Sequence, residues 1–344
     1  MRKKLLAGIL ALALCSTNMP PQTIFAGEFT SGNPDVVSEE ETPEIFTNEE
    51  QETAGETDEE LSVFSSEEVP EFNDAPDEAM AAAENEQAGE IDLADNDKVM
   101  NGVYTISSAG DHKFTCSRET ENRIMVDGKG ISPEDSINIY LNKVNINTST
   151  GPALRINVNV KATVTIYLTG TNNLITKHTW YAGLQKVNTA LLIITTNVSD
   201  TTAGILNAHG SSDGDGAGIG GGLSGSCSNI TIESCSVIAS SKYGAGIGGG
   251  KQGAGSKITI NSASVNASST DGAGIGGGLY GAGSGSDITI NSSSVTASST
   301  NGAGIGGGKG GAGSNNITIN GGSVKASSVS GSPTNKGKEV YCCT

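Results

Sequence analysis

The chain contains the heptapeptide Gly216-Ala217-Gly218-Ile219-Gly220-Gly221-Gly222, and the same seven residue types recur from Gly244, Gly272 and Gly302. The copies start 28, 28 and 30 residues apart. Self-similarity at a fixed period of this size is typical of architectures in which each repeat forms one supersecondary unit and stacks on the next. The period therefore indicates a stacked repeat and argues against an ordinary globular domain.

Two further segments recur between the copies of the heptapeptide. The triplet Ile230-Thr231-Ile232 returns in every period, and so does the run Ser236–Ser241. All three segments are short and alternate apolar with polar or small residues, which is the pattern of β-strands. Three strands in about 28 residues suit one coil of a parallel β-helix, whereas a propeller blade needs four strands in roughly 40 residues. We therefore expect an all-β, right-handed, single-stranded parallel β-helix.

The inward apolar positions of such a solenoid should form columns that continue upstream of the glycine-rich coils. One expected column consists of Leu154, Leu184, Ile219, Ile247, Ile275 and Ile305. Another continues the Ile-Thr-Ile triplets upstream through Ile137–Ile139, Val164–Ile166 and Leu192–Ile194. Asn261, Asn291 and Asn320 follow three of the triplets and should form a side-chain hydrogen-bond ladder, with Glu233 as the exception. The first coil should begin within Val103–Ser107.

Charge divides the chain into three segments. Residues 1–26 carry the features of a secretory signal peptide, namely Arg2-Lys3-Lys4, the apolar run Leu5–Cys15 and an expected cleavage after Ala26. Residues 27–97 contain 25 Asp and Glu and no Lys or Arg, which predicts a disordered acidic linker. Residues 98–344 are assigned to the β-helix, with Gly-rich coils at 216–329. Because no apolar run reaches the roughly 18 residues of a membrane span, we expect an exported protein, extracellular or at the cell surface.

Composition argues against a typical compact enzyme. Aromatic residues make up 4 % of the chain and charged residues 17 %, while glycine contributes 48 residues. The string Gly-Ala-Gly-Ile-Gly-Gly fits a dinucleotide fingerprint, but a phosphate cradle needs a helix after it and none is expected here. His112, His178 and His209 share no spacing that predicts a metal site or a catalytic triad. We therefore expect no catalytic residue, no cofactor other than Ca²⁺ and no nucleic-acid partner, and we assign the glycines to close approach of neighbouring coils.

Oxygen-bearing side chains supply the candidate binding residues. Asp213 and Asp215 could donate oxygens to Ca²⁺, although two carboxylates are few for such a site. Asp215, Asp271 and Asn301 precede heptapeptides at equivalent positions and could form an oxygen-lined ridge, or could serve only as turn residues. Thr231, Thr259, Thr289 and Thr318 form an outward column that could hold sugar chains, or could reflect only the preference of threonine for strands.

The cysteines leave two readings open. Cys227 and Cys235 fall within one coil and could form a disulfide in an oxidising compartment. Cys235 could equally fill the place that Ala263 and Ser293 hold in later coils. The chain ends on the strand-like run Tyr341-Cys342-Cys343, where no cap is predicted, and we expect a fragment of a longer product.

The heptapeptide, the Ile-Thr-Ile triplet and the Ser-Val-x-Ala run together resemble a family of exported bacterial proteins described as carbohydrate-binding domain-containing. Members are often part of adhesin-like surface proteins, and their fold is similar to the pectate-lyase β-helix. Arg123–Val126, Ile137–Val144 and Tyr181–Lys186 fit the upstream coils of that family. The resemblance implies binding of a polysaccharide or of a host or cell-surface glycan, by a monomer or by part of a larger surface protein.

We therefore expect an exported, non-catalytic, carbohydrate-binding or adhesin-like β-helix protein. The acidic clusters that pectate lyases and polygalacturonases use are not evident, since the repeat coils offer only Glu233, Asp271 and Asp287 after Asp215. The alternatives are a β-helix polysaccharide lyase or hydrolase and a purely structural spacer of a larger surface protein.

Overall fold

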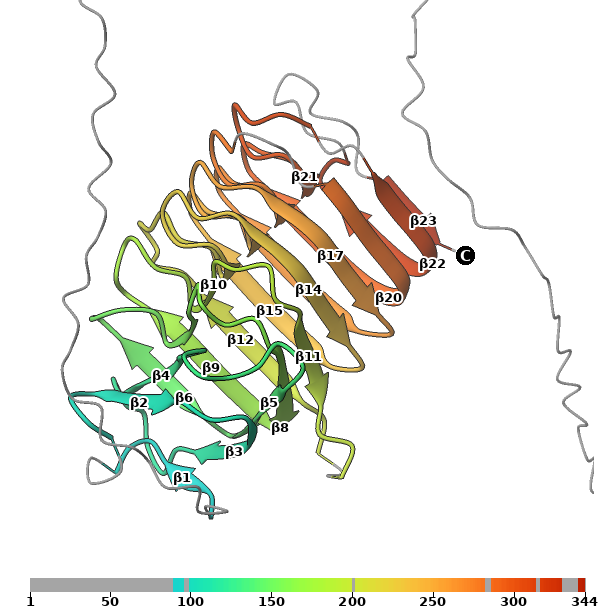
Figure 1. Cartoon of the computed structure of the whole chain (residues 1–344). Helices are drawn as coiled ribbons and strands as arrows, with labels where there is room; N and C mark the ends of the chain where they lie inside the picture. Colours follow the sequence, from blue (N-terminus) through green and yellow to red (C-terminus); the bar gives the residue numbers. More distant parts are fainter. Residues whose placement is uncertain are drawn as a thin grey trace, which may run out of the picture. The chain divides into compact units, whose positions relative to one another are not determined.

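Parallel strands stack into a β-helix in the computed structural model, which describes residues 89–95, 99–199, 202–281, 286–313, 316–329 and 340–343 (Figure 1). The expected signal peptide and the acidic linker up to residue 88 lie outside the described residues. Where the chain is described, it contains no helix long and apolar enough to cross a membrane. The predicted fold class is therefore confirmed as a β-solenoid built from successive three-strand turns.

The strands form three faces of the solenoid, numbered 1 to 3. Along the chain, each turn runs through face 3, then face 1 and then face 2. Face 1 consists of β1 (Ile91–Asp92), β3 (Gly110–Thr115), β5 (Ser136–Asn142), β8 (Thr163–Thr169), β11 (Leu192–Thr196), β14 (Cys227–Glu233), β17 (Gly255–Asn261) and the first halves of β20 (Ser286–Ser299) and β22 (Ile317–Ala326). Face 2 consists of β6 (Asn145–Thr148), β9 (Thr171–Thr176), β12 (Ile205–His209), β15 (Ser236–Ser241), β18 (Ser264–Ser269) and the second halves of β20 and β22. Face 3 consists of β2 (Val103–Ile106), β4 (Arg123–Val126), β7 (Leu154–Ile156), β10 (Leu184–Lys186), β13 (Ile219–Gly220), β16 (Ile247–Gly248), β19 (Ile275–Gly276) and β21 (Ile305–Gly306).

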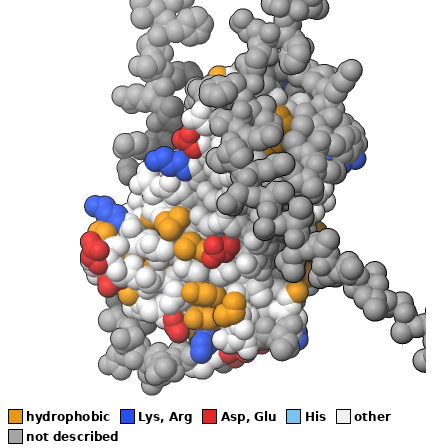
Figure 2. Space-filling model, turned by 90° about the vertical axis from the view of Figure 1, so that its right-hand side faces the viewer, with side chains coloured by type: hydrophobic (Ala, Val, Ile, Leu, Met, Phe, Trp, Pro, Cys, Tyr) orange, Lys and Arg blue, Asp and Glu red, His pale blue; other side chains and the backbone are white. Residues whose placement is uncertain are grey.

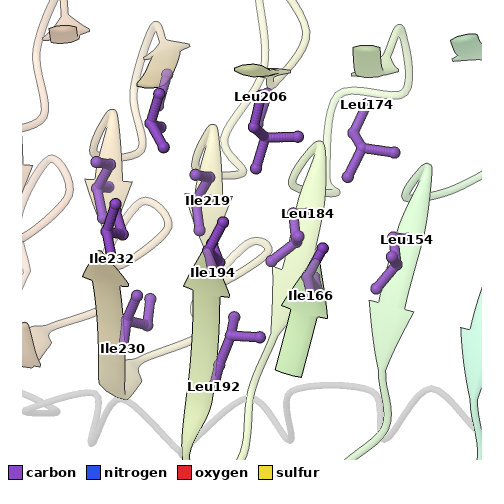
Figure 3. Packing of buried hydrophobic residues seen from close by; sticks show 14 of the residues in the cluster. Leu154, Ile166, Leu174, Leu184, Leu192, Ile194, Leu206, Ile219, Ile230 and Ile232 are labelled. Carbon is purple, nitrogen blue, oxygen red and sulfur yellow. The ribbon is translucent and has the colours of Figure 1, made fainter. Parts of the chain in front are cut away.

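The core consists of the aliphatic columns that the repeat predicts. Register pairs join each residue of the face 3 column to the next, in the order Leu154, Leu184, Ile219, Ile247, Ile275 and Ile305, and all six are fully buried. Figure 3 shows Ile166, Ile194 and Ile232 of face 1 in the interior, together with Leu154, Leu184 and Ile219 of face 3. Alternation along each strand turns these apolar side chains inward and the polar ones outward.

The heptapeptide folds back on itself because its glycines leave room for the neighbouring turns. In one copy the Ala245 N–H donates to the Gly249 carbonyl oxygen over 2.8 Å, and the other three copies make the same bond. Gly248 has φ +136°, and a Cβ there would overlap the carbonyl oxygen of Gly276 in the next turn. The glycines therefore serve close approach between turns, as expected, and no helix follows any heptapeptide within the described residues.

Two features at the ends of the solenoid differ from expectation. β1 lies inside the range assigned to the acidic linker, yet Ile91 pairs with Phe114 of β3 and Leu93 is fully buried. The ordered β-helix therefore includes residues 89–95, because apolar side chains near the end of the acidic run cover the first turn. At the other end, β23 (Val340–Cys343) is a strand as expected. The sequence also predicts an uncapped end, but β23 turns back and pairs antiparallel with β22, so it covers the edge of that strand.

Candidate functional site

Face 1 carries the predicted threonine column on its outer surface. Register pairs place Thr231, Thr259, Thr289 and Thr318 in successive turns, and each side chain is half-buried. The same column begins upstream with Asp111, Asn138, Thr165 and Ile193. The outer surface of face 1 therefore presents a straight row that is mostly hydroxyl and amide groups.

A second outward column lies two residues further along the same strands. It runs through Lys113, Tyr140, Tyr167, Thr195, Glu233, Asn261, Asn291 and Asn320. The Asn291 amide donates to Asn261 Oδ1 and the Asn320 amide to Asn291 Oδ1, each over 2.8 Å. These two bonds confirm the predicted asparagine ladder.

The upstream end of this second column is a pair of stacked tyrosines that the sequence analysis missed. The ring centroids of Tyr140 and Tyr167 are 4.7 Å apart and the ring planes are inclined by 14°. Lys113 Nζ lies 5.8 Å from the Tyr140 centroid. Burial, with a smaller contribution from the nearby Asp111 carboxylate, raises the pKa of the Tyr140 hydroxyl, which therefore stays a neutral donor at neutral pH. The signal was available, since Ile139-Tyr140-Leu141 recurs as Ile166-Tyr167-Leu168 after one turn.

A cavity of about 330 Å³ lies beside Tyr140 at the first turns of face 1. It is lined by Glu90, Asp111, Lys113, Tyr140, Leu141, Asn142, Thr169, Asn197 and Ser199. Both of its carboxylates are oriented by amides of later turns, since Asn142, two turns on, donates to Glu90 Oε1 and Asn138, in the next turn, donates to Asp111 Oδ1, each over 2.8 Å. Figure 2 shows the side of the molecule that lies to the right in Figure 1, where hydrophobic side chains gather next to acidic and basic ones. Seven of the nine lining residues are polar or charged and only Tyr140 and Leu141 are apolar, so the cavity is more polar than a usual small-molecule site and offers mainly hydrogen-bonding groups.

The predicted oxygen-lined ridge forms at the corner between faces 2 and 3, but its carboxylates already have partners. Asn301 donates its amide to Asp271 Oδ1 over 2.8 Å, so neighbouring members of the column touch. Lys251 Nζ lies 3.1 Å from Asp215 Oδ1, and Lys309 Nζ lies 3.8 Å from Asp271 Oδ1. Each aspartate precedes a heptapeptide, and its lysine partner follows the heptapeptide of the next turn. The ridge is thus a ladder of ion pairs that joins successive turns.

The two aspartates proposed for Ca²⁺ are paired with different lysines. Lys242 Nζ lies 2.7 Å from Asp213 Oδ1, and this hydrogen bond raises the pKa of Lys242 to about 12. Asp215 pairs with Lys251 as described above. In the described part of the chain, no group of three or more His, Cys, Asp or Glu side chains is placed to hold a metal ion. A cation at Asp213 and Asp215 would have to displace both lysines, so the residues present do not fit Ca²⁺ well.

Cys227 and Cys235 are both free and buried. Cys227 begins β14 and Cys235 follows the end of that seven-residue strand, a separation of about 20 Å in extended backbone. A disulfide requires Cα atoms within about 7 Å, so the pairing considered above does not form. Cys235 instead fills the place of Ser293, because both side chains donate to a carbonyl oxygen of the preceding turn, at Ile194 and Ile260 respectively.

The interior also contains a lysine that the sequence analysis did not single out. Lys186, the last residue of β10, is fully buried and donates to the carbonyl oxygens of Asn188 and Ser228 over 2.8 and 2.6 Å. Burial lowers the pKa of its ammonium group, and burial raises the pKa of the neighbouring Cys227 thiol to about 11. No access from solvent reaches this pair, so we assign it to the core and not to a site.

Comparison with protein families matches the chain to the beta helix repeat at residues 230–251, 258–279, 288–309 and 317–332. Each matched segment starts at the first isoleucine of an Ile-Thr-Ile triplet, so the match follows the period found in the sequence. No curated protein and no solved structure matches the chain. The chain is therefore a β-helix repeat protein, in agreement with its stacked parallel strands.

Proposed function

We propose that this chain is an exported, non-catalytic, adhesin-like β-helix protein that binds a polysaccharide or a cell-surface glycan along face 1. The observation that carries the proposal is the pair of outward columns, which align hydroxyl, amide and tyrosine side chains over successive turns. Strands of a parallel sheet lie about 4.8 Å apart, so donors and acceptors repeat closely enough to contact successive units of an extended sugar chain. The signal-peptide features of residues 1–26 and the resemblance to exported carbohydrate-binding proteins support the same proposal.

A pair of variants in one turn tests whether face 1 is the binding face. Thr259 in β17 and Asn266 in β18 both point outward, on face 1 and face 2 respectively. The full chain is applied to an array of plant, microbial and host glycans with and without Ca²⁺, and bound oligosaccharides are titrated by calorimetry. Thr259→Lys should weaken binding by roughly tenfold or more, because a long cation interrupts the row, whereas Asn266→Lys should leave it unchanged.

Two outcomes would contradict this proposal. Retention of no glycan under any condition would remove the binding function and leave the structural spacer as the better account. Equal loss of binding in the face 1 and face 2 variants would show that the glycan does not lie along face 1.

Catalysis is the second candidate function, because Glu90 and Asp111 line the same cavity. A pair of carboxylates beside a sugar site is the arrangement that glycoside hydrolases use for acid and base steps. A reducing-sugar assay tests hydrolysis, and ultraviolet absorbance of unsaturated ends tests lyase action on pectin. Turnover that disappears in both Glu90→Gln and Asp111→Asn would make the chain an enzyme and would overturn its description as non-catalytic.

A further inference from the structure

We propose that the cavity beside Tyr140 binds one uncharged sugar unit of the glycan that lies along face 1 and that it disfavours uronic acid units. The inference rests on the proposed function and adds the ligand class and the subsite. The cavity belongs to the first turns of face 1, and Lys113 and Tyr140 are members of the second outward column. A chain that follows this column from the asparagine ladder therefore reaches the cavity at its upstream end.

Tyr140 supplies the aromatic wall of the subsite, and Tyr167, which does not line the cavity, supports the Tyr140 ring by stacking on it. Tyr140 and Tyr167 stack at 4.7 Å, so each ring holds the other in place and neither has to be ordered when a ligand arrives. A sugar ring has an apolar surface of C–H groups that packs against such a wall. Lys113 Nζ stands 5.8 Å from the Tyr140 centroid on an exposed, flexible side chain, so it can move aside for a sugar ring.

The polar groups of the cavity suit hydroxyls. The carboxylates of Glu90 and Asp111 each accept one amide hydrogen bond, which fixes their orientation and leaves further acceptor positions on both oxygens. Thr169 and Ser199 add hydroxyls, and Asn197 adds an amide, on the lining of the same cavity. Hydroxyl protons of a neutral sugar can be donated to the carboxylates, and its oxygens can accept from the other groups.

The charges of the cavity decide against an anionic sugar. Two carboxylates face one ammonium group, that of Lys113, among the lining residues. Glu233 continues the second column two turns downstream of Tyr167 and adds a further carboxylate to it. Asp111 and Tyr140 line the same cavity from neighbouring strands, β3 and β5, so the Asp111 carboxylate lies near the ring against which a sugar would stack. A uronate carboxylate in this cavity would therefore meet like charges at short range.

Calorimetric titration of the full chain with two sets of oligosaccharides of equal length tests the inference. The neutral probes are glucan, mannan and galactan oligosaccharides, and the anionic probe is oligogalacturonate, all at low salt. We expect a neutral probe to bind at least about tenfold more tightly than oligogalacturonate, because like-charge contacts are costly. Asp111→Asn, which keeps the shape of the side chain, should reduce this ratio.

Two further variants separate the tyrosine wall from a general loss of structure. Tyr140→Ala should weaken binding of the neutral probe by roughly tenfold or more, whereas Tyr243→Ala, at the corner between faces 2 and 3, should not. Neutral binding that survives Tyr140→Ala but is lost in Thr259→Lys would overturn the subsite and keep the proposed function. Tighter binding of oligogalacturonate, or a ratio unchanged in Asp111→Asn, would overturn the ligand class. Absence of binding to every probe would remove both proposals.

Discussion

Adjacent glycines of one heptapeptide should respond in opposite ways to the same substitution. Gly276 has φ +133°, and a Cβ there would overlap the carbonyl oxygen of Gly306 in the next turn. Among the described residues, the nearest atom to a Cβ built on Gly277 is 3.7 Å away, which is ordinary contact, and the φ of Gly277 lies outside the left-handed region. Gly276→Ala should therefore destabilise the solenoid severely, and Gly277→Ala should be tolerated.

The magnitude follows from what Gly276→Ala would have to break. Holding alanine at this φ costs about 1–3 kcal/mol. Relieving the overlap means separating two turns, and the bonds at risk include Ile275 N–H to Gly304 O and Gly277 N–H to Gly306 O, both 2.9 Å and each contributing about 0.5–1.5 kcal/mol. We expect a loss of about 2–6 kcal/mol, a large fraction of the roughly 5–15 kcal/mol that stabilises a typical domain. Gly277→Ala should instead stabilise the chain by about 0.4–1 kcal/mol, because alanine restricts the unfolded chain.

Urea unfolding followed by far-ultraviolet circular dichroism compares the natural chain with both variants. A lower midpoint for Gly276→Ala and an equal or higher midpoint for Gly277→Ala, with similar slopes, are the expected results. Equal destabilisation by the two variants would show that Gly277 has no more room for a side chain than Gly276, against the geometry described. A loss below about 1 kcal/mol for Gly276→Ala would show that neighbouring turns do not approach as closely as described.

Three further outcomes follow from the core. In thermal or urea unfolding, Ile247→Ala should lower the free energy of unfolding by about 2–5 kcal/mol and Ile247→Val by about 0.5–1.5 kcal/mol. Equal losses in the two variants would argue against a packed column. Burial raises the pKa of Cys227 to about 11 and that of Cys235 to about 12, so iodoacetamide at pH 8 should label neither of these two thiols until urea is added. Modification of Cys227 or Cys235 in the native chain, located by peptide mass mapping, would contradict their burial. Burial lowers the pKa of Lys186, so the unfolded chain binds the proton of this ammonium group more tightly than the folded chain does. The free energy of unfolding of the natural chain should therefore rise with pH towards the ordinary lysine pKa of about 10.4. Urea unfolding at pH 8 and pH 10 measures this rise, which Lys186→Met should lack.

The sequence was sufficient for the turns of the solenoid because each turn must place the same kind of residue at the same position. The register from Leu154 through Leu184 to Ile219 was predicted across intervals of 30 and 35 residues, although the glycine-rich heptapeptide is absent from the first two turns. An apolar residue that recurs once per turn is buried in the interior of the solenoid. Residues inserted into a turn lie in the loops at its corners and leave the register unchanged. The inward columns therefore follow from periodicity even where the turns differ in length.

The surface chemistry was harder to predict because it depends on partners more than one period away. The column of Asp215 and Asp271 was recognised, but Lys251 and Lys309, which neutralise it, follow the heptapeptide of a later turn. Counting charge by segment also placed Glu90 in the acidic linker, whereas its side chain lines the cavity. Comparing each outward residue of face 1 with the residue one turn later would have found the tyrosine pair, since the residues of a column are one turn apart.

The three faces differ in what they can recognise, and the difference points to face 1. From β13 onward the strands of face 3 are two residues long and end on a glycine, so that face presents mostly backbone there. On face 2 the amide column Asn145, Asn173 and Asn207 is interrupted by the exposed Ile238 and resumes with Asn266 and Thr296, without an aromatic pair or a side-chain hydrogen bond between these two later members. Face 1 alone, within the described residues, combines a hydroxyl row, an amide ladder and an aromatic pair beside a cavity. A rigid scaffold that repeats donors at a fixed spacing can bind an extended ligand without first ordering its own loops, and this favours recognition along face 1 over recognition at the corners.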